Sequence, residues 1–436
     1  MNQSPKILNI VIPEVIYSCN RGEAAIMYGL LQSLKRMGPA KVVLFSDRIA
    51  EDITAYADRG VQIVPFEENR FRDSRSYFIR RLSELYTFLQ FVAAGSILRL
   101  GLRPYFTHLM STTWLSLLES HVIVVGHDNL IVSKLNPRYL ALMMFAKITR
   151  KAIVVPAASI GPLQNSIHAF LIKVFLAGVD LISIRDPESI QYLKDLGVSS
   201  IRLHLTADLA FLMKPATRAR AMEILRNEHV PTEQPLLGIA LGRMAAHAGE
   251  TQSIEQDNVI DAVCSVAKAM KEQFGCYIVI ITHSLGPEIE ADDRVIAETL
   301  LREVGGPNCA VVIGEKYSAP ELKAVIGELD LLIGSRTHSL IAAMGMSTPA
   351  IALTTRKRYK TVGIIGKMFG QSEYMYFTET TDFHSLIEMT RLAWNRRDAI
   401  QSQIDSKKDR IIDSARDFER LLNQLVVLKS CGRLLN

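Results

Sequence analysis

The 436-residue sequence lacks the patterns that define several protein classes. It has only five cysteines and no C-x-x-C pair, so it lacks the cysteine spacing of a zinc ribbon, an iron–sulfur cluster or a disulfide scaffold. Its 16 prolines and 25 glycines are too few for a collagen-like or low-complexity chain. The formal net charge of +5 is small for this length, so charge gives no reason to expect a nucleic-acid partner.

Targeting and membrane-spanning patterns are also missing. The N-terminus opens on a strand-like run, without the basic region and small-residue cleavage site of a secretory signal. No uncharged apolar stretch clearly reaches the roughly 18–20 residues that a spanning helix needs. The odd cysteine count is typical of a reducing compartment. We therefore expect a soluble, cytoplasmic protein.

The sequence does contain an alternation of short apolar runs and longer helical patterns. The runs are rich in β-branched residues and apolar throughout, which is typical of parallel strands buried on both faces. The predicted strands are 7–12, 41–45, 61–65, 121–125, 152–155, 181–184, 201–205, 236–241, 277–282, 310–313, 329–333 and 350–353. This rhythm breaks near 213–234 and then resumes, which predicts an α/β protein of two Rossmann-like, doubly wound domains.

We expect an N-terminal domain over residues 1–213, a second domain over 235–393 and a helical tail over 394–436. One segment of the first domain, residues 70–105, departs from the strand rhythm. It carries seven arginines against only Asp73 and Glu84, together with a block of apolar residues. Two interpretations stay open: a helical insertion that covers a sheet face, or a surface that meets anionic lipid headgroups at the inner face of the cytoplasmic membrane.

The strongest candidate site is the turn that contains Arg336 and His338. A predicted strand ends at Gly334 and a helix follows, so both residues lie where a strand's carboxyl end meets a helix N-terminus. Such a place offers free backbone N–H groups to a phosphate or carboxylate, and open α/β sheets bind ligands there. Arginine adds bidentate oxyanion binding and histidine adds a proton donor. The alternative is a salt-bridged arginine and a buried, hydrogen-bonded histidine.

Three further strand ends carry polar residues. Arg185 follows the predicted strand 181–184, where an ordinary Arg–Asp pair would explain it equally. The first strand-to-helix turn, Asn20-Arg21-Gly22-Glu23, lacks the G-x-G-x-x-G fingerprint, and the helix dipole alone would favour an acid at Glu23. His127 and Asp128 follow the strand 121–125 and are candidates for lining the cleft of the first domain.

Metal and hydrolase chemistry receive little support. His283, Asp292 and Asp293 are residue types that bind metals, yet acids at the start of a surface helix explain them as well, and we expect no metal. The sequence has neither a G-x-S-x-G elbow nor an H-E-x-x-H motif, which argues against the common serine hydrolases and zincins.

From about residue 9 to residue 370 the chain resembles the polysaccharide pyruvyl transferase family. Five motifs occur in the family's order: Cys19–Glu23, Ser159–Leu163, Arg185–Gly197, Asp208–Phe211 and Arg336–His338. In addition, Lys360 matches a lysine that follows the last core strand in the family. Two departures fall in the expected acceptor domain. Glu23 replaces an aspartate, and Gly126-His127-Asp128 replaces a glycine triplet, which favours an unusual acceptor or a changed activity.

The resemblance implies a fold similar to GT-B glycosyltransferases, with a cleft between the domains. It implies transfer of the enolpyruvyl group of phosphoenolpyruvate onto two hydroxyls of one sugar, which forms a cyclic ketal and needs no cofactor. Arg336, Arg185 and Lys360 would bind phosphoenolpyruvate. His338 would transfer protons, with Glu23 as a second candidate. On the acceptor side the candidates are Asn20, Gly22, His127 and Asp128.

Two other function classes stay open. One is a GT-B nucleotide-sugar glycosyltransferase, although the segment after Leu353 is basic, where a nucleoside would need a carboxylate. The other is a non-catalytic scaffold of a polysaccharide assembly complex. The acceptor, which would be a nucleotide sugar, a lipid-linked saccharide or a polymer, and the oligomeric state are not indicated by the sequence.

Overall fold

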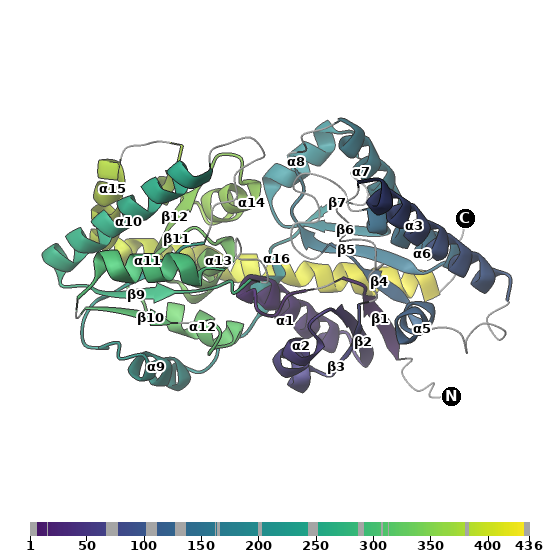
Figure 1. The fold of residues 1–436 in the computed structure, drawn as a ribbon, viewed down its shortest axis with the longest axis horizontal. Helices are drawn as coiled ribbons and strands as arrows, with labels where there is room; N and C mark the ends of the chain where they lie inside the picture. Colours follow the sequence, from purple (N-terminus) through teal and green to yellow (C-terminus); the bar gives the residue numbers. More distant parts are fainter. Residues whose placement is uncertain are drawn as a thin grey trace. The chain divides into compact units, whose positions relative to one another are not determined.

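The computed structural model describes residues 7–14, 16–66, 77–101, 111–126, 137–161, 163, 166–198, 203–242, 252–286, 292–306, 308–312, 314–379 and 383–430. The chain divides into two units, each built around its own sheet (Figure 1). Unit 1 is drawn from residues 1–16, 30–208 and 415–436. Unit 2 is drawn from residues 17–29 and 209–414.

Unit 1 contains a seven-stranded sheet in the order β3-β2-β1-β4-β5-β6-β7, with every neighbouring pair parallel. The strands are β1 (Leu8–Ile12), β2 (Ala40–Ser46), β3 (Val61–Pro65), β4 (Val122–Val124), β5 (Ala152–Ala158), β6 (Leu181–Ile184) and β7 (Leu203–Leu205). The helices between them are α1 (Arg21–Arg36), whose first nine residues belong to unit 2, α2 (Ile49–Tyr56), α3 (Tyr77–Arg99), α5 (Thr112–Glu119), α6 (Pro137–Thr149), α7 (Ser166–Gly178) and α8 (Pro187–Asp195).

Unit 2 contains a six-stranded sheet in the order β10-β9-β8-β11-β12-β13, again parallel throughout. Its strands are β8 (Leu236–Ala240), β9 (Tyr277–Ile281), β10 (Cys309–Val312), β11 (Leu331–Gly334), β12 (Ala350–Thr354) and β13 (Met375–Phe377). Its helices are α9 (Arg218–Asn227), α10 (Gln252–Phe274), α11 (Arg294–Val304), α12 (Ala319–Ile326), α13 (Thr337–Met346), α14 (Tyr359–Thr361), α15 (Phe383–Asn395) and α16 (Arg397–Ser430), whose last 16 residues belong to unit 1.

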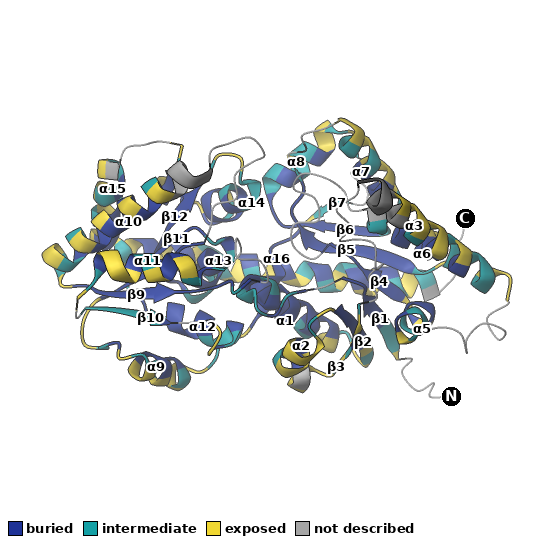
Figure 2. Cartoon of the chain, viewed as in Figure 1, coloured by how far each residue is buried: buried dark blue, intermediate teal, exposed yellow. Residues whose placement is uncertain are grey.

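The central strands are buried because helices cover both faces of each sheet, whereas the edge strands β3, β7 and β10 are partly exposed (Figure 2). All seven residues of β5 and all five of β9 are buried, as a parallel strand with no polar face requires. Local sequence fixes where the helices begin. Asp186 caps α8 by accepting the Ser189 N–H at 2.8 Å, with Pro187 at the first helical position. Ser318 and Glu321 form a capping box at the start of α12.

The predicted strands and the α/β class are confirmed, within one to three residues at the strand ends. Strand β13 was not predicted from the sequence. The expected domain ranges and the two units share their sheets but differ at four segments. Residues 17–29, 209–213 and 394–414 belong to unit 2, and residues 415–436 belong to unit 1. The helical pattern of the tail is confirmed as α16.

The insertion at 70–105 is described only in part. Its helix, α3, lies within the structure, whereas residues 70–76 and 102–105 lie outside the described residues. The inner side of α3 packs against α6, with the ring centroids of Phe91 and Phe145 6.0 Å apart. Among the described residues, none of the helices combines the length and the apolar composition that crossing a membrane requires.

Candidate functional site

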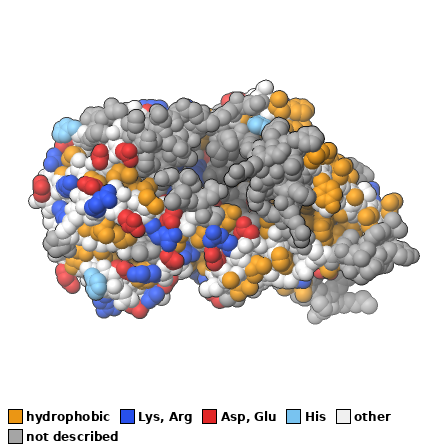
Figure 3. All heavy atoms as spheres, viewed as in Figure 1, with side chains coloured by type: hydrophobic (Ala, Val, Ile, Leu, Met, Phe, Trp, Pro, Cys, Tyr) orange, Lys and Arg blue, Asp and Glu red, His pale blue; other side chains and the backbone are white. Residues whose placement is uncertain are grey.

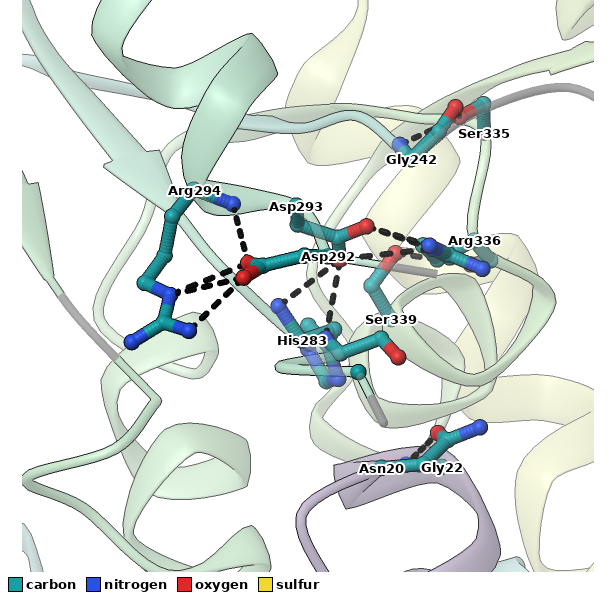
Figure 4. Close-up of polar contacts among 12 residues, drawn as sticks. Asn20, Gly22, Gly242, His283, Asp292, Asp293, Arg294, Ser335, Arg336 and Ser339 are labelled. Atoms are coloured by element: carbon teal, nitrogen blue, oxygen red, sulfur yellow. Dashed lines mark hydrogen bonds and ion pairs between the residues drawn. The ribbon is translucent and has the colours of Figure 1, made fainter. Parts of the chain in front are cut away.

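The candidate site of unit 2 lies where the strands of its sheet end. Strand order reverses between β8 and β11, and the carboxyl ends beside such a switch point are where open α/β sheets bind ligands. A hydrogen bond links the two strand ends there, since the Gly242 N–H donates to Ser335 Oγ at 3.0 Å (Figure 4). Arg336 follows Ser335 and directly precedes α13. The predicted position of Arg336, between a strand end and a helix N-terminus, is confirmed.

Asp293 fixes the guanidinium of Arg336. Arg336 Nε donates to Asp293 Oδ1 at 3.0 Å, and a second nitrogen of Arg336 donates to the same oxygen (Figure 4). The Asp293 side chain is 1% exposed and that of Arg336 is 26% exposed. Burial raises the pKa of Asp293 above its usual value, while Arg336 and the backbone N–H groups of His283 and Ser284 act in the opposite direction. Arg336 is therefore an oriented cation that reaches solvent.

Two glycines make room for the side chains of this site. A Cβ at Gly242 would overlap the guanidinium of Arg336, and a Cβ at Gly22 would lie 2.5 Å from Nδ1 of His338. Gly22 is in the first turn of α1, and His338 is in the first turn of α13. The structure therefore brings together two residues that sequence analysis had placed on different sides of the reaction, His338 as catalytic and Gly22 as acceptor-binding.

The segment around Gly22 is attached to unit 2 by backbone contacts. The Arg21 N–H donates to the His283 carbonyl at 2.8 Å, and Asn20 forms an isolated bridge with Ser284. The Arg21 guanidinium donates to the Gly314 carbonyl, with Nε at 2.8 Å. These bonds tie the turn to the ends of β9 and β10. They explain why residues 17–29 belong to unit 2 and not to the sheet that precedes them.

Glu23 uses its carboxylate to shape this same turn. Its Oε1 accepts from the Asn20 side chain at 3.0 Å and its Oε2 accepts from the Tyr17 N–H at 3.0 Å. Asn20 in turn accepts the Gly22 N–H at 3.0 Å (Figure 4). The structure thus gives Glu23 and Asn20 a role in holding the loop. A role for Glu23 in proton transfer stays a prediction.

His283 is a residue of the site that sequence analysis weighed only as a metal ligand. It is 5% exposed, and neither ring nitrogen has a hydrogen-bond partner among the described residues. Burial, and secondarily positive charge at His338, Arg336 and Arg21, lowers the pKa of His283 to about 3. The ring is therefore neutral, with one donor and one acceptor nitrogen to offer a ligand.

The carboxylates that accompany His283 in the sequence bind guanidinium groups. Asp293 binds Arg336, and Asp292 binds Arg294 at 2.7 Å (Figure 4). No group of three or more His, Cys, Asp or Glu side chains suited to a metal is found among the described residues. The sequence signal for His283 was its position directly after a buried strand. That position indicates a binding site equally well when the ligand is not a metal.

Arg358 is the residue that sequence analysis missed. It follows β12 and donates from its guanidinium to the Ser335 carbonyl at 3.0 Å. Burial, and secondarily the charge of Arg336, lowers the pKa of Arg358 to about 10. Among the described residues no carboxylate forms an ion pair with it. The basic run 356–360 was noticed, but the sequence favoured Lys360, which is half-buried in α14 two residues further on.

The remaining predicted residues lie elsewhere. Arg185 belongs to unit 1, where it is fully buried and binds Asp208 at 2.6 Å and Ser159 at 2.8 Å. His127 and Asp128 lie outside the described residues. Gly126 just before them has a positive φ of 78°, and its N–H donates to the buried carboxylate of Glu14. The donor, acceptor and catalytic roles assigned to these residues stay predictions, as does the cleft expected between the domains.

Comparison with known proteins supplies the family. The family model for polysaccharide pyruvyl transferases matches residues 20–357, which include His283, Arg336 and His338. The chain is also 23% identical over 316 residues to the amylovoran biosynthesis protein AmsJ of Erwinia amylovora. That match covers 71% of this chain and 73% of AmsJ.

Solved structures agree on the fold. MnaA from S. aureus, in a co-structure with UDP, has a TM-score of 0.60 at 11% identity and covers 98% of both chains. A glycosyltransferase from Rickettsia africae has a TM-score of 0.58 at 9% identity, over 97% of this chain and 99% of that one. At these identities the likeness shows the fold alone, and that fold is the GT-B type that the sequence predicts.

Proposed function

Because the chain belongs to the polysaccharide pyruvyl transferase family, we propose that it transfers the enolpyruvyl group of phosphoenolpyruvate onto two hydroxyls of one sugar. The product is a cyclic pyruvate ketal in a cell-surface polysaccharide or glycolipid. The likeness to a protein named for amylovoran biosynthesis supports a place in polysaccharide biosynthesis. The proposal needs no cofactor, since phosphoenolpyruvate is itself the activated donor.

One observation carries the proposal: the arginines gathered at the strand ends of unit 2. Phosphoenolpyruvate has a phosphate and a carboxylate, so it needs several cations in one place. Arg336 is oriented by Asp293. Arg358 donates to the Ser335 carbonyl, and it lies close enough to Arg336 for the charge of Arg336 to lower the pKa of Arg358. Placing two guanidinium groups together costs free energy that a bound anion offsets. The proposal keeps Lys360 and Arg185 as further donor ligands.

The proton transfers can be assigned to side chains of the same site. A proton added to C3 of phosphoenolpyruvate makes C2 electrophilic, and a sugar hydroxyl adds there. Phosphate then leaves and the second hydroxyl attacks C2. The two sugar hydroxyls each lose a proton. One of these protons restores the acid that protonated C3, and the other leaves with the phosphate. His338, in the first turn of α13, is our choice for these transfers, with Glu23 second.

The acceptor and the cellular location belong to the same proposal. The acceptor is a nucleotide sugar, a lipid-linked saccharide or a polymer, and Asn20, Gly22, His127 and Asp128 are its candidate contacts. The position of Gly22 against His338 supports this assignment, since the attacking hydroxyl must reach the proton-transfer residue. We place the reaction in the cytoplasm, with peripheral attachment to the membrane where the acceptor is lipid-linked.

The decisive experiment measures phosphate release from phosphoenolpyruvate with a panel of saccharide acceptors, followed by mass analysis of the product. The proposal expects equal amounts of phosphate and ketal. Release of UDP from a nucleotide sugar, without consumption of phosphoenolpyruvate, would favour the glycosyltransferase alternative. Intact polysaccharide in cells that carry Arg336→Ala and His338→Gln would favour the scaffold.

A further inference from the structure

We infer that unit 1 carries a membrane-binding surface, made by the outer sides of α3, α6 and α7, that fits anionic phospholipid. This surface, called here the three-helix face, extends beyond the segment that the sequence indicated, because α6 and α7 lie outside residues 70–105. The inference is carried by exposed apolar side chains and by charge. It rests on neither Arg336 nor His338, and it would stand if the transfer reaction were a different one.

Two of these helices expose apolar residues at helical spacing. On α3 the exposed residues are Leu82, Leu85, Tyr86 and Leu89, each between 49% and 57% exposed. On α7, Ile167 is 65% exposed, Phe170 is 63% and Val174 is 40%. The spacings i, i+3, i+4 and i+7 on α3, and i, i+3 and i+7 on α7, put each set on a single side of its helix.

The same helices already bury a second apolar side in the core of unit 1. On α3 the buried residues include Phe91, and on α7 they include Phe175. Phe91 lies against Phe145 of α6, and the ring of Phe175 lies 5.8 Å from that of Tyr139, also on α6. The helix α6 therefore lies between α3 and α7, and the outer apolar residues are not needed to fill the core.

The outer residues gather on one part of the surface. Figure 3 shows hydrophobic side chains clustered over the part of unit 1 where Figure 1 places α7 and α3. Met144 of α6 is also exposed, at 37%. Contiguous exposed apolar area of this kind is uncommon on a protein that meets only water, and it marks a site of association.

Charge decides which partner fits. Among the described side chains of the three helices, the charged ones are four cations, Arg99, Arg138, Lys147 and Lys173, of which Lys147 pairs with Asp180. A helix face with leucine and aromatic side chains among lysine and arginine is the pattern of helices that lie in a membrane interface. Basic residues are attracted to a negatively charged leaflet, and salt screens this attraction.

The test is co-sedimentation of the full chain with vesicles of phosphatidylglycerol and phosphatidylcholine, and with vesicles of phosphatidylcholine alone. We expect binding to the anionic vesicles that weakens as salt is raised. The double variants Leu85→Ser/Leu89→Ser and Ile167→Ser/Phe170→Ser and the charge variant Arg99→Ser/Lys173→Ser should each reduce the affinity at least tenfold. The control Val295→Ser/Leu301→Ser removes two apolar residues of α11 in unit 2, which are 42% and 39% exposed, and should bind like the parent.

Three results would overturn the inference: no binding to either vesicle, binding that ignores lipid charge, or binding that the variants of α3 and α7 leave unchanged. Concentration-dependent dimerisation without lipid, lost in Leu85→Ser/Leu89→Ser, would assign the face to a second copy instead. Phosphate release with a water-soluble acceptor should be the same in these variants as in the parent. This last measurement also confirms that they fold, and it separates the membrane inference from the proposed reaction.

Discussion

Two arginines at strand ends, one in each unit, have the same signature in the sequence and different surroundings in the structure. Arg185 directly follows β6 of unit 1, and Arg336 lies two residues after β11 of unit 2. Each pairs with an aspartate that is 1% exposed, Asp208 for the first and Asp293 for the second. In both cases a helix begins within two residues, so an anion-binding role is indicated equally for the two by sequence.

The difference lies in what else meets each guanidinium. The side chain of Arg185 is 0% exposed, and the groups around it are acceptors, Asp208 and the Ser159 hydroxyl. The side chain of Arg336 is 26% exposed, and besides Asp293 it faces the charge of Arg358 and the neutral ring of His283. A buried arginine whose surroundings neutralise it stabilises a fold. An accessible arginine beside a second cation prepares a site for an anion.

The largest effect that this comparison predicts is on the stability of unit 1. Arg185→Met removes one partner of a buried ion pair and leaves Asp208 charged and out of water, which costs about 3–5 kcal/mol of unfolding free energy. Chemical denaturation of the purified variant measures it. As a control, Arg48→Met breaks the exposed pair with Glu51 and should cost less than about 1 kcal/mol.

This prediction also tests Arg185 as a donor ligand. A variant that keeps the stability of the parent but loses affinity for phosphoenolpyruvate would remove the contrast between the two arginines. Both would then be binding residues, as the sequence resemblance implies.

The next effect is on turnover. His338→Gln should lower the rate of ketal formation by about 10²–10⁴-fold, which is the usual contribution of general acid–base catalysis. Donor affinity should stay within a few-fold of the parent, because glutamine keeps hydrogen-bonding capacity beside Gly22 without transferring a proton. Steady-state kinetics gives the result, and His168→Gln on α7 is the control. Turnover within a few-fold of the parent would remove His338 from the proton-transfer role.

A smaller loss is expected at Arg336 itself. Arg336→Ala should weaken the binding of phosphoenolpyruvate by about 1.5–3 kcal/mol, as measured by titration calorimetry, because it removes charge-assisted hydrogen bonds to a partly desolvated anion. The variant also leaves Asp293 buried and unpaired, so Arg336→Ala/Asp293→Asn separates lost attraction from added repulsion. Arg294→Ala breaks a nearby half-exposed pair and serves as the control. If Arg336→Ala binds phosphoenolpyruvate as tightly as the parent, Arg336 is no donor ligand.

Sequence patterns were sufficient for the fold because buried parallel strands such as β5 and β9 are apolar at every position. They were sufficient to place Arg336 and His338 at the turn between β11 and α13, because a strand end and a helix start are local features. They could not rank Arg358 above Lys360, since which of these two half-buried basic residues approaches Arg336 depends on the path of the chain after β12. Nor could they show that residues 17–29 contact β9 and β10, because those contacts join segments about 260 residues or more apart.

The smallest predicted effect concerns His283, whose burial sets the site of unit 2 apart from the network around Arg185. The pKa of His283 is lowered to about 3 in the folded protein, against about 6.5 for an exposed imidazole. Between these values the unfolded chain binds a proton that the folded chain excludes. His283 therefore contributes stability that is fully present above about pH 6.5 and is lost as the pH falls toward 3.

The variant His283→Asn should flatten this acid dependence by at most about 1.4 kcal/mol per pH unit, measured by denaturation between about pH 6.5 and pH 4.5. The pKa of Asp293 is raised, so its contribution has the opposite sign and is present at low pH and lost as the pH rises. Comparing His283→Asn/Asp293→Asn with Asp293→Asn alone therefore isolates the histidine. Equal slopes with and without His283 would mean that its ring is charged in the folded protein. The contrast with Arg185 would then rest on the exposure of Arg336 and on Arg358 alone.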